Sequence, residues 1–290
     1  MLLSYVHDFL ATMESDLTVR DRKTALGRLR NLGLTDFAAV LWNTPLAQYP
    51  RISSLLPSMA SPEVQRAWTG ACGAALLGQS LSFIRSLSCN YSNLTGSPLS
   101  GKRILDFGCG YGRLTRLCYF YSDDIWAVDP WVEALSLCRQ AGLTANLFKS
   151  DDLPLTLPVP DNFEVVIAYS VLTHTSERTT KTVLEAMRRH VRPGGIACVT
   201  IRPLEYWKMW YTSPHNPELR ATDVDMERQH RESGYAFAPH LRQRVDGEIT
   251  FGDTSITTDW FVRNIPGWRV VAYDHSPEDI LQRFLFLQRD

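Results

Sequence analysis

Apolar residues recur at three- and four-residue spacing through the first 95 residues, as in Leu26, Leu29 and Leu32. This period places them on one face of a helix, so the segment is expected to be helical. Ser61 before Pro62 predicts a helix start, because serine caps free backbone amides and proline suits the first turn. The loop-forming run at 91–98 then predicts a boundary, with a helical N-terminal extension or lid at 1–98 and the main domain at 99–290.

From residue 103 the pattern changes to short apolar runs that alternate with helical stretches. Strands are expected at 103–106, 125–129, 145–148, 163–168 and 196–201, and helices at 113–121, 132–141 and 177–191. Fully apolar strands in such an alternation indicate a parallel sheet covered on both faces. Two last runs, 268–273 and 284–287, are joined by a short connection, which favours an antiparallel pair. The prediction is a doubly wound, mostly parallel seven-stranded α/β sheet of Rossmann-like type with an antiparallel last strand.

An insert at about 203–257 interrupts this alternation and has no clean periodicity. Residues 248–257 alternate around Gly252 and Asp253, which predicts a hairpin that turns at that pair.

Composition narrows the possible partners. The net charge of −1 gives no basic excess, so binding of nucleic acid through its phosphates is not expected. Six scattered cysteines contain no Cys-x-x-Cys pair, which argues against a disulfide framework or a metal site. No apolar run is long enough to cross a membrane, and the first residues lack the pattern of a signal peptide. We therefore expect a cytoplasmic protein with no metal, no membrane contact and no nucleic-acid partner; its oligomeric state is not indicated.

The strand at 103–106 runs into glycines at alternate positions, Gly108, Gly110 and Gly112, and then into a helix. Glycines there let the backbone turn sharply and approach a ligand closely. A dinucleotide fingerprint would need its third glycine at position 113, where this chain has Arg113. The early third glycine, with Asp106 two residues before the first, resembles class I S-adenosylmethionine (SAM)-dependent methyltransferases, particularly bacterial-type small-molecule methyltransferases, from about residue 103 to the end.

The resemblance implies SAM as the cofactor and assigns roles to several residues. Asp106 would steady the loop and hold the methionine end. Asp129, at the end of the next strand, would accept the ribose hydroxyls. The remaining candidates are Trp131 against the adenine, Asp151 or Asp152 at its amino group, and Ser170 at the crevice where the fourth strand ends. Trp131 could equally be a core tryptophan, and the paired acids could simply be solvated.

The methyl acceptor is less clearly indicated. His174, after the fourth strand, and His240, in the insert, are candidate bases, although His174 could instead order the start of the next helix and His240 could be a surface histidine. Aromatic residues at the start of the insert suit an organic substrate, and Arg202 could clamp a carboxylate. Trp68 could close over the site from the N-terminal helices, or pack as part of them. The candidate acceptor-binding residues are therefore Trp68, Arg202, Tyr206, Trp207 and Tyr211; a helix packed on the sheet is the alternative for the last three.

The sequence thus predicts an enzyme that methylates a small molecule, with an oxygen of a metabolite or natural product as the first expectation. Methylation of an amine or a thioether such as methionine is an alternative, because a thioether carries no proton to remove. A SAM-binding protein without transferase activity is the second alternative. A base-flipping enzyme is not expected, because Ala168-Tyr169-Ser170-Val171 replaces the Asn or Asp, two prolines and aromatic residue that such enzymes carry.

Overall fold

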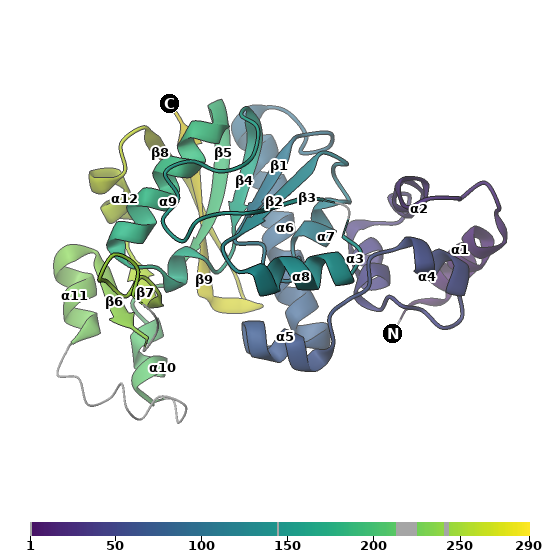
Figure 1. The fold of residues 1–290 in the computed structure, drawn as a ribbon, viewed down its shortest axis with the longest axis horizontal. Coiled ribbons are helices and arrows are strands. Elements are labelled where there is room, and N and C mark those ends of the chain that lie inside the picture. Colours follow the sequence, from purple (N-terminus) through teal and green to yellow (C-terminus); the bar gives the residue numbers. More distant parts are fainter. Residues whose placement is uncertain (1, 144, 213–224, 241–243) are drawn as a thin grey trace. The chain divides into compact units, whose positions relative to one another are not determined.

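A computed structural model describes residues 2–143, 145–212, 225–240 and 244–290. The chain divides into two compact units, one of Met1–Ser88 with Pro98–Lys149 and the other of Cys89–Ser97 with Ser150–Asp290. The strands form a seven-stranded sheet in the order β3-β2-β1-β4-β5-β9-β8 and a two-stranded sheet of β6 and β7 (Figure 1). Within the described residues, no helix is long and apolar enough to cross a membrane.

The first unit begins with helices, as the apolar spacing predicts. They are α1 (Ser4–Ser15), α2 (Arg22–Leu29), α3 (Leu34–Trp42), α4 (Pro50–Leu55), α5 (Pro62–Thr69) and the start of α6 (Gly73–Thr95). Helix α5 starts at the predicted cap, where the Ser61 side chain accepts a hydrogen bond from the backbone N–H of Val64. Gly70, with φ of 75°, ends it in the left-handed conformation that glycine adopts without strain.

The remaining elements of the first unit are β1 (Ile104–Phe107), α7 (Thr115–Cys118), β2 (Ile125–Asp129), α8 (Val132–Gln140) and β3 (Asn146–Lys149). The three strands pair in parallel. The helix predicted at 113–121 is a single turn, because turns precede it at Tyr111–Leu114 and follow it at Tyr119–Tyr121. The N-terminal helices are bonded to this part: Arg30 Nε donates to the Tyr119 carbonyl (2.7 Å).

The second unit holds the other strands of the large sheet. Its elements are β4 (Phe163–Ala168), the 3₁₀ turn η1 (Leu172–His174), α9 (Glu177–His190), β5 (Val191–Ile201), α12 (Thr258–Asn264), β8 (Trp268–Ser276) and β9 (Asp279–Arg289). Strands β4 and β5 are parallel, while β9 runs antiparallel to both β5 and β8. The predicted seven-stranded α/β sheet with an antiparallel last strand is confirmed.

The insert forms α10 (Tyr206–Thr212), α11 (Met226–Ser233), β6 (Tyr235–Pro239) and β7 (Gly252–Ile256), which Figure 1 shows grouped together. The predicted hairpin turning at Gly252 and Asp253 is wrong, because both residues lie inside β7, which pairs with β6. Gly252 is needed there for a different reason. A Cβ at this position would lie 2.1 Å from the Ala238 carbonyl oxygen, so only glycine allows the two strands to approach.

Candidate cofactor and acceptor sites

The glycine loop follows β1 in the first unit and is held against the end of β2. The backbone N–H groups of Gly108 and Cys109 both donate to the Val128 carbonyl, at 2.8 and 3.1 Å. Gly108, Gly110 and Gly112 all have positive φ, at 71°, 54° and 76°. At Gly112 a Cβ would also lie 2.0 Å from Leu143 Cδ1, so this glycine is required by both conformation and packing.

Asp129 ends β2 and faces this loop. Its Oδ2 accepts a hydrogen bond from the Gly110 N–H and its Oδ1 one from the Trp131 N–H, both at 2.9 Å. The side chain is buried, with 5% of its surface exposed. Two backbone donors thus fix the orientation of the carboxylate and join the two loops that the sequence assigned to the cofactor.

Asp106 lies beneath the loop in β1 and is also buried. Thr115 donates its hydroxyl proton to Asp106 Oδ2 at 2.6 Å. Burial raises the pKa of Asp106 to about 6, and this effect outweighs the Thr115 hydrogen bond, which lowers it; the nearby Asp129 raises it further. A buried carboxyl with such a pKa gains from a positive charge beside it, such as the ammonium group of an amino acid.

Aromatic side chains pack over the same loop. Trp68 from α5 lies 5.7 Å from Trp131 and 6.3 Å from Tyr111, measured between ring centroids. Its ring is also the nearest neighbour of a Cβ built on Gly110, at 3.7 Å. Trp68, predicted to contact the acceptor, therefore lies among the residues assigned to the cofactor.

The remaining cofactor candidates belong to the second unit. Asp151 and Asp152 are exposed in the segment after β3. Ser170 follows β4 with φ of 59°, a conformation unusual for a residue with a side chain. Its N–H donates to Thr200 Oγ1 at 2.7 Å, and Gln282 Nε2 donates to its hydroxyl at 3.4 Å.

In the second unit, four of the predicted acceptor-site residues gather around one carboxylate that the sequence did not single out, Asp253. Arg202 Nη1 donates to its Oδ1 at 2.7 Å, and His240 Nε2 lies 2.9 Å from its Oδ2. The Arg202 guanidinium lies over the Tyr206 ring, 4.1 Å from its centroid. Arg202 Nη2 also lies 3.1 Å from His174 Nε2. We call Asp253, Arg202, His174, His240 and Tyr206 the Asp253 cluster.

The surroundings in the cluster shift the pKa values of three of its members. Burial alone would raise the pKa of Asp253, but the hydrogen bond with His240 and the charge of Arg202 lower it well below its usual value. Burial lowers the pKa of His174 to about 3, with the Arg202 charge adding to the effect, so this imidazole is neutral at physiological pH. Burial raises the pKa of Tyr206 far above its usual value, so its hydroxyl keeps its proton.

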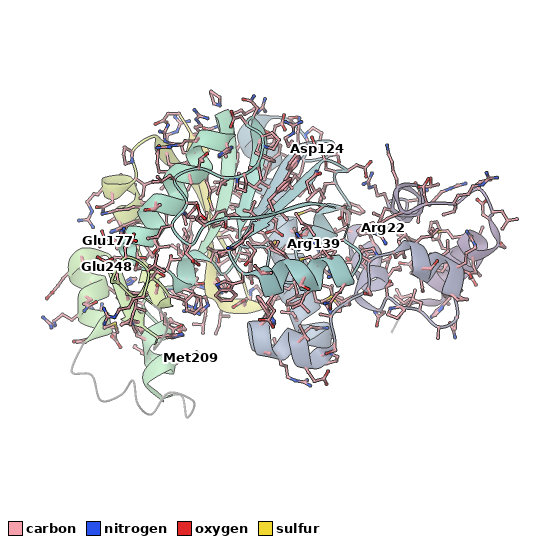
Figure 2. The ribbon with its side chains drawn as sticks, viewed as in Figure 1. Arg22, Asp124, Arg139, Glu177, Met209 and Glu248 are labelled. Carbon is pink, nitrogen blue, oxygen red and sulfur yellow. The ribbon has the colours of Figure 1, made fainter. Side chains whose placement is uncertain are left out.

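The two remaining acceptor candidates are Trp207 and Tyr211. Trp207 is fully buried, donates its indole N–H to Ser255 Oγ at 2.7 Å and packs with Met226 and Ala236. It therefore has no surface for a substrate in this conformation and supports the insert instead. Tyr211 lies in α10, but its side chain is outside the described part of the chain. Figure 2 shows the side chains of the second unit, with Met209 on α10 and Glu177 at the start of α9.

Asp253 could not be singled out from the sequence, because the pattern around it predicts a turn. The signal that could have identified it is its place inside an alternating strand pattern, where an aspartate is unfavourable unless it is paired. Arg202, the ion-pair partner of Asp253, is itself a sequence candidate, but the two residues lie too far apart in the chain for the sequence to indicate that they pair.

A glycine loop after the first strand of a parallel sheet, with a buried acid at the end of the second, is an arrangement with which sheets of this type bind a nucleotide cofactor. Residues 104–195 match a family model described as a methyltransferase domain. This segment carries the methyltransferase domain of a class I SAM-dependent methyltransferase.

Curated relatives match over similar stretches. A ubiquinone biosynthesis O-methyltransferase of Paraburkholderia phymatum is 32% identical over 101 residues, which are 33% of this chain and 43% of the relative. One from Maricaulis maris is 28% identical over 135 residues, or 42% of this chain and 49% of the relative. The matched segments thus span about half the length of these relatives. Among solved structures, a magnesium protoporphyrin IX methyltransferase of Synechocystis aligns with a TM-score of 0.48 and 14% identity, covering 79% of this chain and 94% of the other.

Proposed function

We propose that this chain transfers a methyl group from SAM to an oxygen of a small organic acceptor. The observation that carries the cofactor part is the carboxylate of Asp129, which two backbone N–H groups hold against the glycine loop. A carboxylate fixed in this way can accept hydrogen bonds from two neighbouring hydroxyls, as a ribose offers. The glycines keep the loop free of side chains on the side that a ligand would approach.

The residues present fit the rest of SAM. Asp106 is buried and its pKa is raised, so the ammonium group of the methionine part would stabilise its charged form. Trp131 and Trp68 offer aromatic surfaces for the adenine. We include Asp151, Asp152 and Ser170 as further cofactor contacts because they follow β3 and β4 in the chain, where strands of this type of sheet end at the ligand crevice.

Bound SAM supplies a methyl group on a positively charged sulfur. The chain's own task is to orient the acceptor in line with that bond, exclude water and take up a proton where the acceptor has one. The Asp253 cluster is the best candidate for the acceptor side, because it combines a histidine–carboxylate pair with an aromatic side chain.

Oxygen is favoured as the acceptor atom by the same pair. A hydroxyl has to lose its proton during methylation, and a histidine beside a carboxylate can take it, whereas a thioether needs no such group. The curated relatives above are named as O-methyltransferases, which supports the same choice. Arg202 is not free to clamp a carboxylate, since Asp253 already neutralises it, so we expect an acceptor without a carboxylate at this point.

The first test is calorimetric titration with S-adenosylhomocysteine, using NADH as the competing cofactor class. We expect micromolar binding of S-adenosylhomocysteine and none of NADH. Asp129→Ala should weaken binding at least tenfold, while Asp8→Ala, which removes an exposed carboxylate from α1 of the same unit, should leave it unchanged. Binding of NADH in place of S-adenosylhomocysteine by the unmodified protein would overturn the proposal, whatever the variants do.

A further inference from the structure

The two carboxylate oxygens of Asp253 have different partners. Oδ1 accepts from the Arg202 guanidinium at 2.7 Å, and Oδ2 lies 2.9 Å from His240 Nε2. The carboxylate is buried, with 5% of the residue exposed, and its low pKa keeps it charged. A charged carboxylate can only accept hydrogen bonds, so His240 must carry a proton on Nε2.

His174 carries its proton on the opposite nitrogen. Its Nδ1 lies 2.9 Å from the Gly252 carbonyl oxygen, which can only accept, so Nδ1 is the donor. Its Nε2 lies 3.1 Å from Arg202 Nη2, which can only donate, so the Nε2 lone pair is already used. Both nitrogens of His174 are therefore engaged, and its low pKa agrees with an imidazole that does not accept a further proton.

His240 differs in its hydrogen bonding. In the part of the chain that the structure describes, its Nδ1 makes no hydrogen bond, and 31% of its side chain is exposed. Phe251 holds both rings in place, since it stacks parallel to His174 at 5.2 Å and meets His240 edge-on at 5.5 Å. The His240 backbone N–H also donates to the Phe251 carbonyl at 3.1 Å. The His240 ring is thus held by Phe251 and partly exposed, and its Nδ1 has no hydrogen-bond partner among the described residues.

We propose that His240 is the catalytic proton acceptor and that Asp253 is the residue that positions it, whereas His174 has a structural role. This assignment rests on the proposed function. The acceptor hydroxyl would give its proton to His240 Nδ1 while its oxygen forms the bond to the methyl carbon. The carbon–sulfur bond breaks at the same time, and its electron pair stays on the sulfur. The resulting imidazolium keeps its Nε2 hydrogen bond to Asp253 Oδ2, and water then removes the proton from Nδ1.

The assignment can be tested without knowing the acceptor, because it fixes which nitrogen of each histidine is protonated. Nitrogen-15 NMR of histidine-labelled protein reports this directly. The measurement is made at pH 8, because an imidazole is neutral well above its ordinary pKa of about 6.5. His240→Asn and His174→Asn identify the two sets of signals, and His275→Asn, at an exposed histidine of β8, is the matched control. We expect Nε2–H at His240 and Nδ1–H at His174.

Asp253→Asn separates positioning from packing. It should reduce the Nε2–H signal of His240 at least twofold, while His174 keeps its Nδ1–H because its partner is the Gly252 carbonyl. S-adenosylhomocysteine affinity should stay within twofold in this variant, since the cluster is assigned to the acceptor. Nδ1–H at His240 in the unmodified protein would overturn this inference alone, even if Asp253→Asn does not fold. Absence of S-adenosylhomocysteine binding would overturn the proposed function instead.

Discussion

Asp106 and Asp253 are both buried carboxyls, yet their surroundings shift their pKa values in opposite directions. Burial dominates at Asp106 and raises its pKa to about 6, because the Thr115 hydrogen bonds and the Arg113 charge lower it less and the Asp129 charge raises it. Asp253 has a guanidinium and an imidazole, which outweigh burial and lower its pKa. The first is suited to receive a cation from a ligand, whereas the second already has its cation from the protein.

This difference predicts how cofactor binding depends on pH. If only the charged form of Asp106 binds the ammonium of S-adenosylhomocysteine, affinity should fall about tenfold for each pH unit below 6 and be constant above it. Thr115→Val removes the hydrogen bond that lowers this pKa, so the midpoint should move to higher pH. Calorimetric titrations from pH 5 to 8 measure both effects.

Thr182→Val is the control for that experiment, because Thr182 is a partly exposed residue of α9 whose hydroxyl donates to the Arg178 carbonyl of its own helix. Its titration curve should overlay that of the unmodified protein. Affinity that stays constant between pH 5 and 8 would exclude a charged Asp106 from ligand binding.

Two glycines of the loop should respond differently to alanine. Gly110→Ala meets only the Trp68 ring, at 3.7 Å, so its cost is the left-handed conformation, about 1–2 kcal/mol. Gly112→Ala adds the clash with Leu143 and should cost about 3 kcal/mol in the free energy of unfolding. Urea denaturation measures both. Gly110→Ala should nevertheless weaken S-adenosylhomocysteine binding at least tenfold, and equal stability losses for the two variants would contradict this account.

At the scale of elements, single strands could be predicted more reliably than contacts between segments that lie far apart in the chain. The runs at 125–129 and 163–168 match β2 and β4 residue for residue, because a strand covered on both faces is predominantly apolar. The glycine loop and Asp129 could also be predicted, since they lie close together in the chain. The Asp253 cluster could not, because it joins the end of β5, η1 and β7, and contacts between distant segments leave no local pattern.

Gly252 in the insert is a second residue whose role depends on a contact between separate segments. Gly252 in an alternating run predicts a turn, but in the structure it allows β7 to approach the Ala238 carbonyl of β6. Turn glycines and close-approach glycines look alike in a single sequence, and only the strand pairing distinguishes them.

Gly252→Ala is therefore expected to disrupt the β6–β7 sheet. The clash is with backbone, which cannot move aside without breaking the pairing, so we expect a loss of about 3 kcal/mol in the free energy of unfolding. Gly27→Ala is the control, because Gly27 lies exposed inside α2 with nothing within 4 Å of an added Cβ. That variant should gain about 0.4–1 kcal/mol. Denaturant unfolding compares them, and a fully stable Gly252→Ala would show that the strand pairing is different.

At the scale of the whole molecule, Asp106 and His174 should make opposite contributions to the pH dependence of stability. The folded pKa of Asp106 is raised from 3.8 to about 6, so between these values the folded state holds a proton that the unfolded state has lost, and stability falls as pH rises. The folded pKa of His174 is lowered from 6.5 to about 3, so the unfolded state holds the extra proton and stability rises with pH. Each slope is about 1.4 kcal/mol per pH unit.

The two slopes cancel between pH 4 and 6 only if both compact units unfold in one transition, because only then do both protons count in the same free energy. Single variants should reveal each of the two slopes separately. His174→Gln leaves the Asp106 contribution, so stability should fall as pH rises from 4 to 6, whereas Asp106→Asn leaves the His174 contribution and should reverse the slope. Urea denaturation across this range measures both. Slopes of the same sign in the two variants would show that one of the two pKa shifts has the wrong direction. Two separate transitions with opposite slopes would instead show that the units unfold independently, with Asp106 titrating in one and His174 in the other.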